Sequence, residues 1–153
     1  MKRAAAILFL ATALVPTTGA AGVLDQFADG RSACFARSYD AQHLARHPAQ
    51  SVAWIALDRD RKSDDAGTTL RLRFRLKHSA EVFGTLVACR PSGSDARCLV
   101  EADGGALRLS EKGGALRLVA ERVAVEGGNG IAEFHPKEDR VFLLRPQKGA
   151  TCR

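Results

Sequence analysis

The stretch from Thr69 to Lys77 constrains the fold more than any other part of the chain, because it alternates strictly between apolar and basic side chains. Leu70, Leu72, Phe74 and Leu76 alternate with Arg71, Arg73, Arg75 and Lys77. Successive side chains on a β-strand point to opposite faces, so one face of this strand is apolar and the other carries four cations. The stretch predicts a half-buried strand, and therefore a protein built on a sheet.

Most of the chain after Ser51 shows strand patterns separated by short, glycine-rich turns. The other predicted strands are Val52–Leu57, Glu81–Arg90, Arg97–Asp103, the repeated hexapeptide Gly-Gly-Ala-Leu-Arg-Leu at 104–109 and 113–118, Ile131–Phe134 and Arg140–Arg145. Leu116–Val125 also fits a helical stripe, but its valines and flanking glycines favour a strand with a bulge. The pattern predicts a mainly β fold, a single antiparallel meander of seven or eight strands that forms a barrel or a sandwich.

Two short segments near the N-terminus are predicted to be helical. Val23–Ala28 has room for one or two turns before Gly30. Ser38–His47 begins with a side chain able to cap free amides and ends before Pro48, through which a helix does not continue. The fold should therefore carry a short helical N-terminal segment.

The first 21 residues predict export. Lys2 and Arg3 precede the apolar stretch Ala4–Val15, and small residues follow at 18–21. This is the pattern of a cleavable secretory signal, cut after Ala20 or Ala21, and its apolar part is too short to span a bilayer. Residues 22–153 would then form one β domain of a periplasmic or extracellular protein. The short charged start and the compact signal are typical of a bacterial protein. A lipoprotein anchor is not expected, since no cysteine lies at the cut.

All four cysteines lie in the predicted mature chain, where an oxidising compartment favours disulfides. Four cysteines allow three pairings. A hairpin between Cys89 and Cys98 sets them opposite each other on an apolar face, which leaves Cys34 and Cys152 to join the two ends of the chain. A redox or zinc centre is not favoured, because the chain has no Cys-x-x-Cys.

The cations of Thr69–Lys77 are the strongest candidate for a binding surface. Without Lys2 and Arg3 the chain has 21 basic and 17 acidic side chains, a mild net charge of +4. The predicted basic face consists of Arg71, Arg73, Arg75 and Lys77, together with Arg108 and Arg117. Such a face could hold an acidic partner, for example an acidic glycan, a phosphorylated envelope component or an acidic protein. Nucleic acid is the least favoured partner, because Phe74 points away from the cations and leaves them without a stacking partner.

Three other interpretations stay open. The first is an exposed sheet face without a partner, its charges balanced by Glu101, Glu111 or Glu121. The second is a barrel that carries a small apolar ligand between side chains such as Leu72, Phe74 and Leu86. The third is an enzyme or enzyme inhibitor whose residues converge only in space, because no catalytic motif is present.

Neither a metal nor another cofactor is expected, and the protein is predicted not to be an enzyme. His43 and His47 are four residues apart, but Leu44 occupies the place of the glutamate in a His-Glu-x-x-His site. Asp58, Asp60, Asp64 and Asp65 lack the spacing and the glycine of a calcium-binding EF-hand loop. These aspartates predict a solvated hairpin tip.

Overall fold

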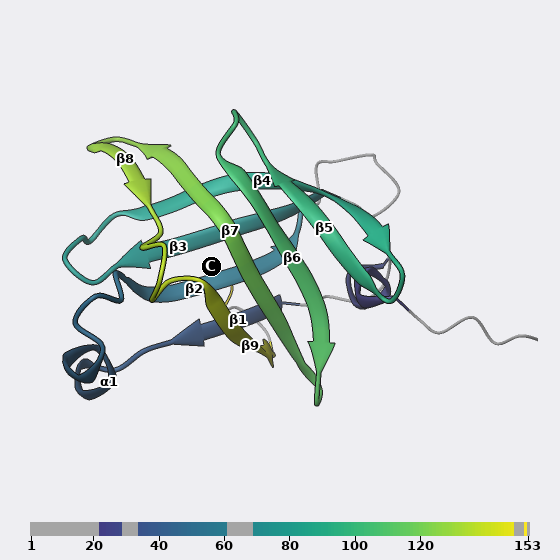
Figure 1. The fold of residues 1–153 in the computed structure, drawn as a ribbon, viewed down its shortest axis with the longest axis horizontal. Helices are drawn as coiled ribbons and strands as arrows, with labels where there is room; N and C mark the ends of the chain where they lie inside the picture. The colour runs from purple at the N-terminus through teal and green to yellow at the C-terminus, as the bar shows by residue number, and fades with distance from the viewer. Residues whose placement is uncertain (1–21, 29–33, 61–68, 149–151, 153) are drawn as a thin grey trace, which may run out of the picture.

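The computed structural model describes residues 22–28, 34–60, 69–148 and 152, and most of them belong to one antiparallel sheet that closes into a barrel (Figure 1). The barrel strands are β1 (Cys34–Ser38), β2 (Val52–Arg59), β3 (Thr69–Leu76), β4 (Val82–Ser92), β5 (Asp95–Val100), β6 (Gly105–Lys112), β7 (Ala115–Gly127) and β9 (Val141–Gln147). Strands adjacent in sequence pair from β1 to β7, and β9 pairs with both β7 and β1. The predicted antiparallel meander is confirmed, and its form is a closed barrel.

One further strand, β8 (Gly130–Glu133), lies outside the circle. It pairs with the last residues of β7, Ala124–Gly127. The preceding part of β7 pairs with β6 across a register shift at Ala106/Leu107. This irregularity is the bulge predicted for the valine-rich segment. With this bulge, the long strand β7 pairs with β6 in the barrel and, at its last residues, with β8.

Two turns show how the sequence sets the register of neighbouring strands. β4 and β5 are joined through Gly93-Ser94, with Ser92 opposite Asp95. β6 and β7 are joined through Gly113-Gly114, both at positive φ, which is the backbone of a tight hairpin turn.

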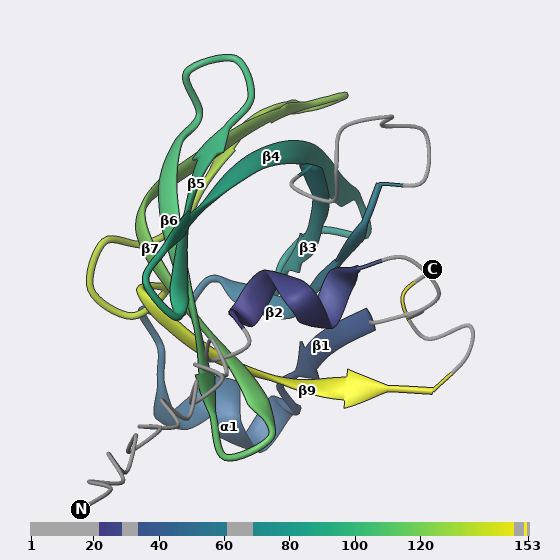
Figure 2. The same ribbon diagram turned by 90° about the vertical axis from the view of Figure 1, so that its right-hand side faces the viewer.

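The helical segments are present but shorter than predicted. η1 (Val23–Phe27) is a 3-10 helix that lies across one opening of the barrel (Figure 2). Its Val23 and Phe27 side chains are buried in the core. α1 spans only Ala41–Arg46, because the carboxylate of Asp40 accepts a hydrogen bond from the His43 amide and caps the helix there. The helix predicted from Ser38 is therefore wrong at its start, and Ser38 ends β1.

The sequence analysis missed β1. Its first three residues, Cys34, Phe35 and Ala36, are all buried, so the strand shows no alternation. Phe35 points into the core, whereas Cys34 and Ala36 pack in a smaller outer cluster beside Trp54. A strand covered on both faces gives no period of two.

Side chains fill the interior of the barrel. The ring of Phe74 stacks on Phe83 at 5.4 Å and meets the edge of Phe134 at 4.8 Å, and Phe134 contacts Phe142 at 5.4 Å. Leu72 and Phe74 expose no surface. Side chains around an empty chamber would expose surface to it, so this part of the barrel is a packed core. Leu86, expected to face inward, lies in register with Arg71 and faces outward.

The two disulfides join Cys89 to Cys98 and Cys34 to Cys152, as the strand pattern favours. The first lies inside the barrel, and the second belongs to the outer cluster beside Trp54. The predicted leader, residues 1–21, lies outside the described residues. No helix in the part of the chain that the structure describes is long and apolar enough to cross a membrane.

Candidate binding surface on the outer wall

The basic residues of β3 face outward, as alternation predicts, but two of them are paired with carboxylates. Arg73 Nη2 lies 3.2 Å from Asp58 Oδ2, and Arg71 forms an ion pair with Asp60. Register places Asp58 directly opposite Arg71, so Arg73 reaches it diagonally across the two strands. Asp58 of β2 and Asp60 just beyond it therefore neutralise two of the four cations between Thr69 and Lys77.

The Arg73 pair is also largely withdrawn from water. Only 16% of the Arg73 side chain and 22% of the Asp58 side chain are exposed. Arg73 Nε and Asp58 Oδ1 are buried and have no hydrogen-bond partner among the residues that the structure describes. A guanidinium group in this position is not available to a large partner.

One expectation about this face is therefore wrong, and a second is confirmed only in part. Asp58 and Asp60 do not form a solvated hairpin tip, because Asp60 is buried and both carboxylates pair with β3. Asp64 and Asp65 lie outside the described residues. The charges that balance β3 come from Asp58 on β2 and from Asp60 just beyond it, whereas Glu121, one of the glutamates expected to balance the basic face, pairs with Arg108.

The two remaining cations of the predicted β3 face differ from each other. Lys77 lies just beyond the end of β3, and its ammonium group donates a hydrogen bond to the carbonyl of Pro48. Arg75 is exposed and has no side-chain partner within the described residues. Arg75 is thus the one freely exposed guanidinium group that this face offers within those residues.

A second basic surface lies on β4, β5 and β6. Arg90 is in register with Arg97, and Arg97 is in register with Arg108. Their strand neighbours Cys89 and Cys98 point inward, so the three arginines point outward. Opposite Cβ atoms are about 5 Å apart, which places the three residues within roughly 10 Å of one another. We call Arg90, Arg97 and Arg108 the arginine row.

Within the described residues, one carboxylate, that of Glu121, pairs with the arginine row. Its Oε1 accepts a hydrogen bond from Arg108 Nε at 3.0 Å, and its Oε2 accepts one from Arg97 Nη2 at 3.2 Å. The hydrogen bond from Arg108, with the charge of Arg97, lowers the pKa of Glu121. Arg90 has no side-chain partner among the residues that the structure describes. The row therefore keeps an excess of positive charge.

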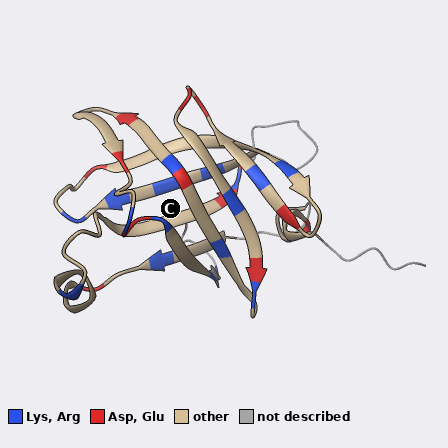
Figure 3. Cartoon of the chain, viewed as in Figure 1, with Lys and Arg blue, Asp and Glu red and all other residues tan. Residues whose placement is uncertain are grey.

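The arginine row is open to solvent. The side chains of Arg97 and Arg108 are 56% and 65% exposed. Figure 3 shows basic segments on β5, β6 and β7 side by side on the face toward the viewer. Arg117 contributes to this face from β7, in register with Ser110, one outward position beyond Arg108.

The structure thus divides the predicted basic face into two surfaces. Arg71, Arg73 and Arg75 lie on β3, whereas Arg108 and Arg117 lie on β6 and β7, with β4 and β5 between them. Sequence reasoning missed Arg90 and Arg97. The hairpin register that sets Cys89 opposite Cys98 also sets these two arginines opposite each other, and that signal would have found them.

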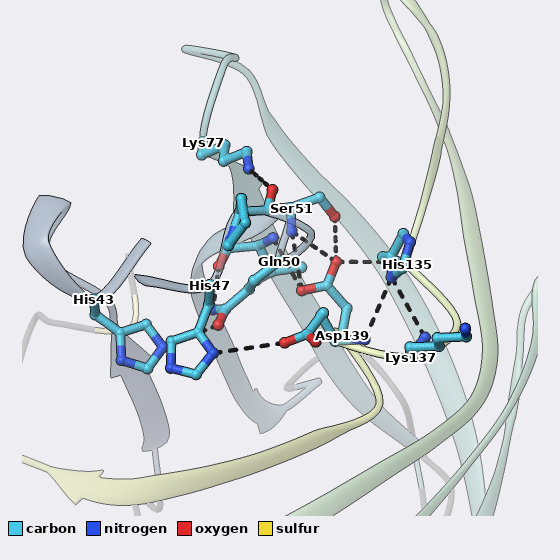
Figure 4. Close-up of polar contacts among 11 residues, drawn as sticks. His43, His47, Gln50, Ser51, Lys77, His135, Lys137 and Asp139 are labelled. Carbon is cyan, nitrogen blue, oxygen red and sulfur yellow. Dashed lines mark hydrogen bonds and ion pairs between the residues drawn. The ribbon is translucent and has the colours of Figure 1, made fainter. Parts of the chain in front are cut away.

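A polar cluster near α1 contains the residue types of a hydrolase triad (Figure 4). The buried carboxylate of Asp139 accepts hydrogen bonds from the Ser51 hydroxyl, from the Ser51 amide at 3.0 Å and from the His135 amide at 3.0 Å. The His135 ring faces the backbone amides of Lys137 and Glu138. Asp139 therefore joins two loops, and the arrangement gives the Ser51 hydroxyl no histidine base.

The histidines of α1 lie at the margin of this cluster. The rings of His43 and His47 stack at 4.4 Å. His43 Nε2 lies 3.0 Å from Gln50 Oε1, and His47 Nδ1 lies 3.6 Å from Glu138 Oε2. No group of three or more possible metal ligands occurs in residues 22–28, 34–60, 69–148 and 152.

Comparison of the chain with protein-family models, with curated proteins and with solved structures found no match. The fold itself defines the class of protein, a disulfide-bonded antiparallel β-barrel with a packed core. That class is compatible with an exported binding or carrier protein.

Proposed function

We propose that this chain is an exported, non-enzymatic binding protein that holds an acidic partner on the outer wall of its barrel. The observation that carries this proposal is the arginine row, in which Arg97 and Arg108 share one carboxylate, Glu121, and Arg90 has no side-chain partner among the described residues. Like charges directly opposite on a sheet destabilise it. An anion that bridges the row would remove this repulsion.

Arginine is well suited to such a partner. Its planar guanidinium group donates two parallel hydrogen bonds to a carboxylate, sulfate or phosphate. A row of three such groups favours an anion with several charged groups over a single small ion. Arg117 extends the same face toward β7.

Export is supported by the two disulfides, which persist in oxidising compartments. The predicted leader would provide the route. The partner is then a component of the periplasm, the cell envelope or the surrounding medium.

The packed core favours the outer wall over the interior as the binding surface. A carrier of a small apolar ligand needs a chamber, yet Leu72 and Phe74 expose no surface. Native mass spectrometry of the purified protein should accordingly show the mass of the chain without a copurifying apolar ligand.

The proposal is tested by binding to dextran sulfate, a soluble polymer whose charge does not change with pH, followed by titration calorimetry. The affinity should fall steadily as salt is raised, because exposed charges are screened. Arg97→Ala should weaken binding about tenfold, the usual effect of losing one charge-assisted contact.

Arg75→Ala is the matched control, since it removes an exposed arginine from β3 and leaves the arginine row intact. It should bind like the unaltered protein. An equal loss in both variants would mean that only net charge matters, and failure of the polymer to bind at all would contradict the proposal.

A further inference from the structure

An apolar row lies beside the arginine row on the same outward face. Ala88 is in register with Leu99, and Leu99 with Ala106; Ala88 and Leu99 are exposed, whereas Ala106 is buried. These residues are two positions along their strands from the arginines, so the two rows are about 7 Å apart. Leu99 is 59% exposed, which is unusual for a large hydrophobic side chain in this protein.

An exposed leucine on its own needs no partner. Because Leu99 lies beside three guanidinium groups, the face fits an anionic partner that also has an apolar part. A soluble polyanion would leave Leu99 in water. A lipid bilayer presents phosphates at its surface and hydrocarbon just below them, which matches a basic row flanked by an apolar side chain.

Of the carboxylates of this face, that of Glu121 reaches the arginine row, and those of Asp95 and Glu101 lie at the margins. Glu121 is bonded to Arg97 and Arg108 at the β7 side, and Asp95 lies two residues before Arg97. Glu101 follows β5 in the turn beyond Leu99. The two central rows themselves contain no acidic side chain.

We propose that this face docks on the surface of an anionic lipid bilayer, with the arginine row on lipid phosphates and Leu99 inserted among the lipids. The inference rests on the proposed function and names the partner of the same surface. The arginine stems can lie along apolar surface while their guanidinium groups reach the phosphates. Docking is peripheral and reversible, since the face offers few cations and one large apolar side chain.

The test is cosedimentation of the full mature chain with lipid vesicles. Vesicles of phosphatidylcholine alone should bind little protein, and vesicles that also contain phosphatidylglycerol should bind it in a salt-dependent way. Arg97→Ala should weaken binding to the anionic vesicles about fivefold, as expected for one cation near a charged membrane. Leu99→Ser should weaken it about tenfold, as expected for one inserted leucine.

The matched control for Leu99→Ser is Ile131→Ser on β8. Ile131 is 75% exposed but lies outside both rows, so its replacement should leave vesicle binding unchanged. Binding of every variant to dextran sulfate is measured in parallel. Leu99→Ser should retain this binding, whereas Arg97→Ala should weaken it about tenfold, as proposed above.

The outcomes separate the two proposals. Binding to dextran sulfate without binding to anionic vesicles would overturn the lipid inference and leave the proposed function standing. Vesicle binding that Leu99→Ser leaves unchanged, and that soluble glycerol phosphate fully displaces, would assign the arginine row to free phosphate compounds and overturn docking. Absence of binding to both would overturn both proposals.

Discussion

The two basic surfaces of this barrel carry the same kind of side chain but have opposite surroundings. On β3, Arg71 and Arg73 each have their own carboxylate, and Arg73 is mostly buried. In the arginine row, Arg97 and Arg108 share one exposed carboxylate, and Arg90 has none in the described part of the chain. The number of cations on a strand therefore does not tell how many of them a partner can reach.

The difference arises from the neighbouring strands. Asp58 at the end of β2 and Asp60 just beyond it lie beside β3, so Arg71 and Arg73 are neutralised within the sheet. Arg97 of β5 instead has an arginine in register on each neighbouring strand. The ion pairs of the β3 surface help to hold the sheet together, whereas the arginine row is proposed to bind an acidic partner.

The largest expected effect is on the free energy of unfolding, and it compares the two disulfides, each of which lies next to one of the basic surfaces. Cys34–Cys152 closes a sequence separation of 118 residues beside the paired β3 face, and Cys89–Cys98 closes one of 9 residues behind the arginine row. In the chain-entropy model, replacing the first pair by alanines should lower the free energy of unfolding by about 5 kcal/mol, and replacing the second by about 2.5 kcal/mol.

Urea unfolding of the two double variants, with the unaltered protein as reference, measures this difference. The Cys89 and Cys98 variant should keep its dextran sulfate binding below the unfolding transition, because the arginine row is held by its strand pairing. Equal losses in the two variants would contradict the entropic explanation.

The second prediction compares the acidic partners of the two surfaces. Asp58→Ala should lower the free energy of unfolding by about 2 kcal/mol, because it leaves the mostly buried Arg73 without its counter-charge. Glu121→Ala should hardly move the urea midpoint, since this carboxylate is at the surface and its pairs are screened.

The double variant Asp58→Ala, Arg73→Met serves as the control. Removing both charges should restore much of the lost stability, because the penalty lies in the unpaired guanidinium group. If Glu121→Ala destabilises the protein as much as Asp58→Ala does, the distinction between a structural pair and a free surface is wrong.

The smallest expected effect is a pH dependence confined to the arginine row. The pKa of Glu121 is lowered from 4.5 by its hydrogen bond with Arg108, so the carboxylate is ionised above that value. Its contribution to stability is present above pH 4.5 and is lost as the pH falls through the lowered pKa. Protonation also releases Arg97 and Arg108, so affinity for dextran sulfate should rise about two- to fivefold in acid.

Glu121→Gln isolates this effect, because other carboxylates also titrate in acid. The variant should bind dextran sulfate more tightly than the unaltered protein at neutral pH, and the two should converge as the pH falls. Titration calorimetry between pH 3 and pH 7 would show this convergence. Parallel curves would mean that Glu121 does not restrain the row.

Local pattern predicted most of the strands of this fold. Alternation predicted β3, and the Gly93-Ser94 turn predicted both the hairpin and the Cys89–Cys98 disulfide. It failed at β1, whose two faces are both covered, and at Leu86, which lies outside the core despite its apolar side chain. Hydrophobic periodicity shows which face a side chain occupies only where one face of the strand is buried and the other is exposed to water.

The sequence by itself determined a β protein with a disulfide across one hairpin and with cations on outward faces, since these depend on neighbours within a few residues along the chain. Only the tertiary structure decided that the sheet closes, that aspartates of β2 neutralise β3, and that Arg90, Arg97 and Arg108 line up. The physical reason is that the charge a residue meets across a sheet depends on strand pairing and register, which bring together segments far apart in the chain.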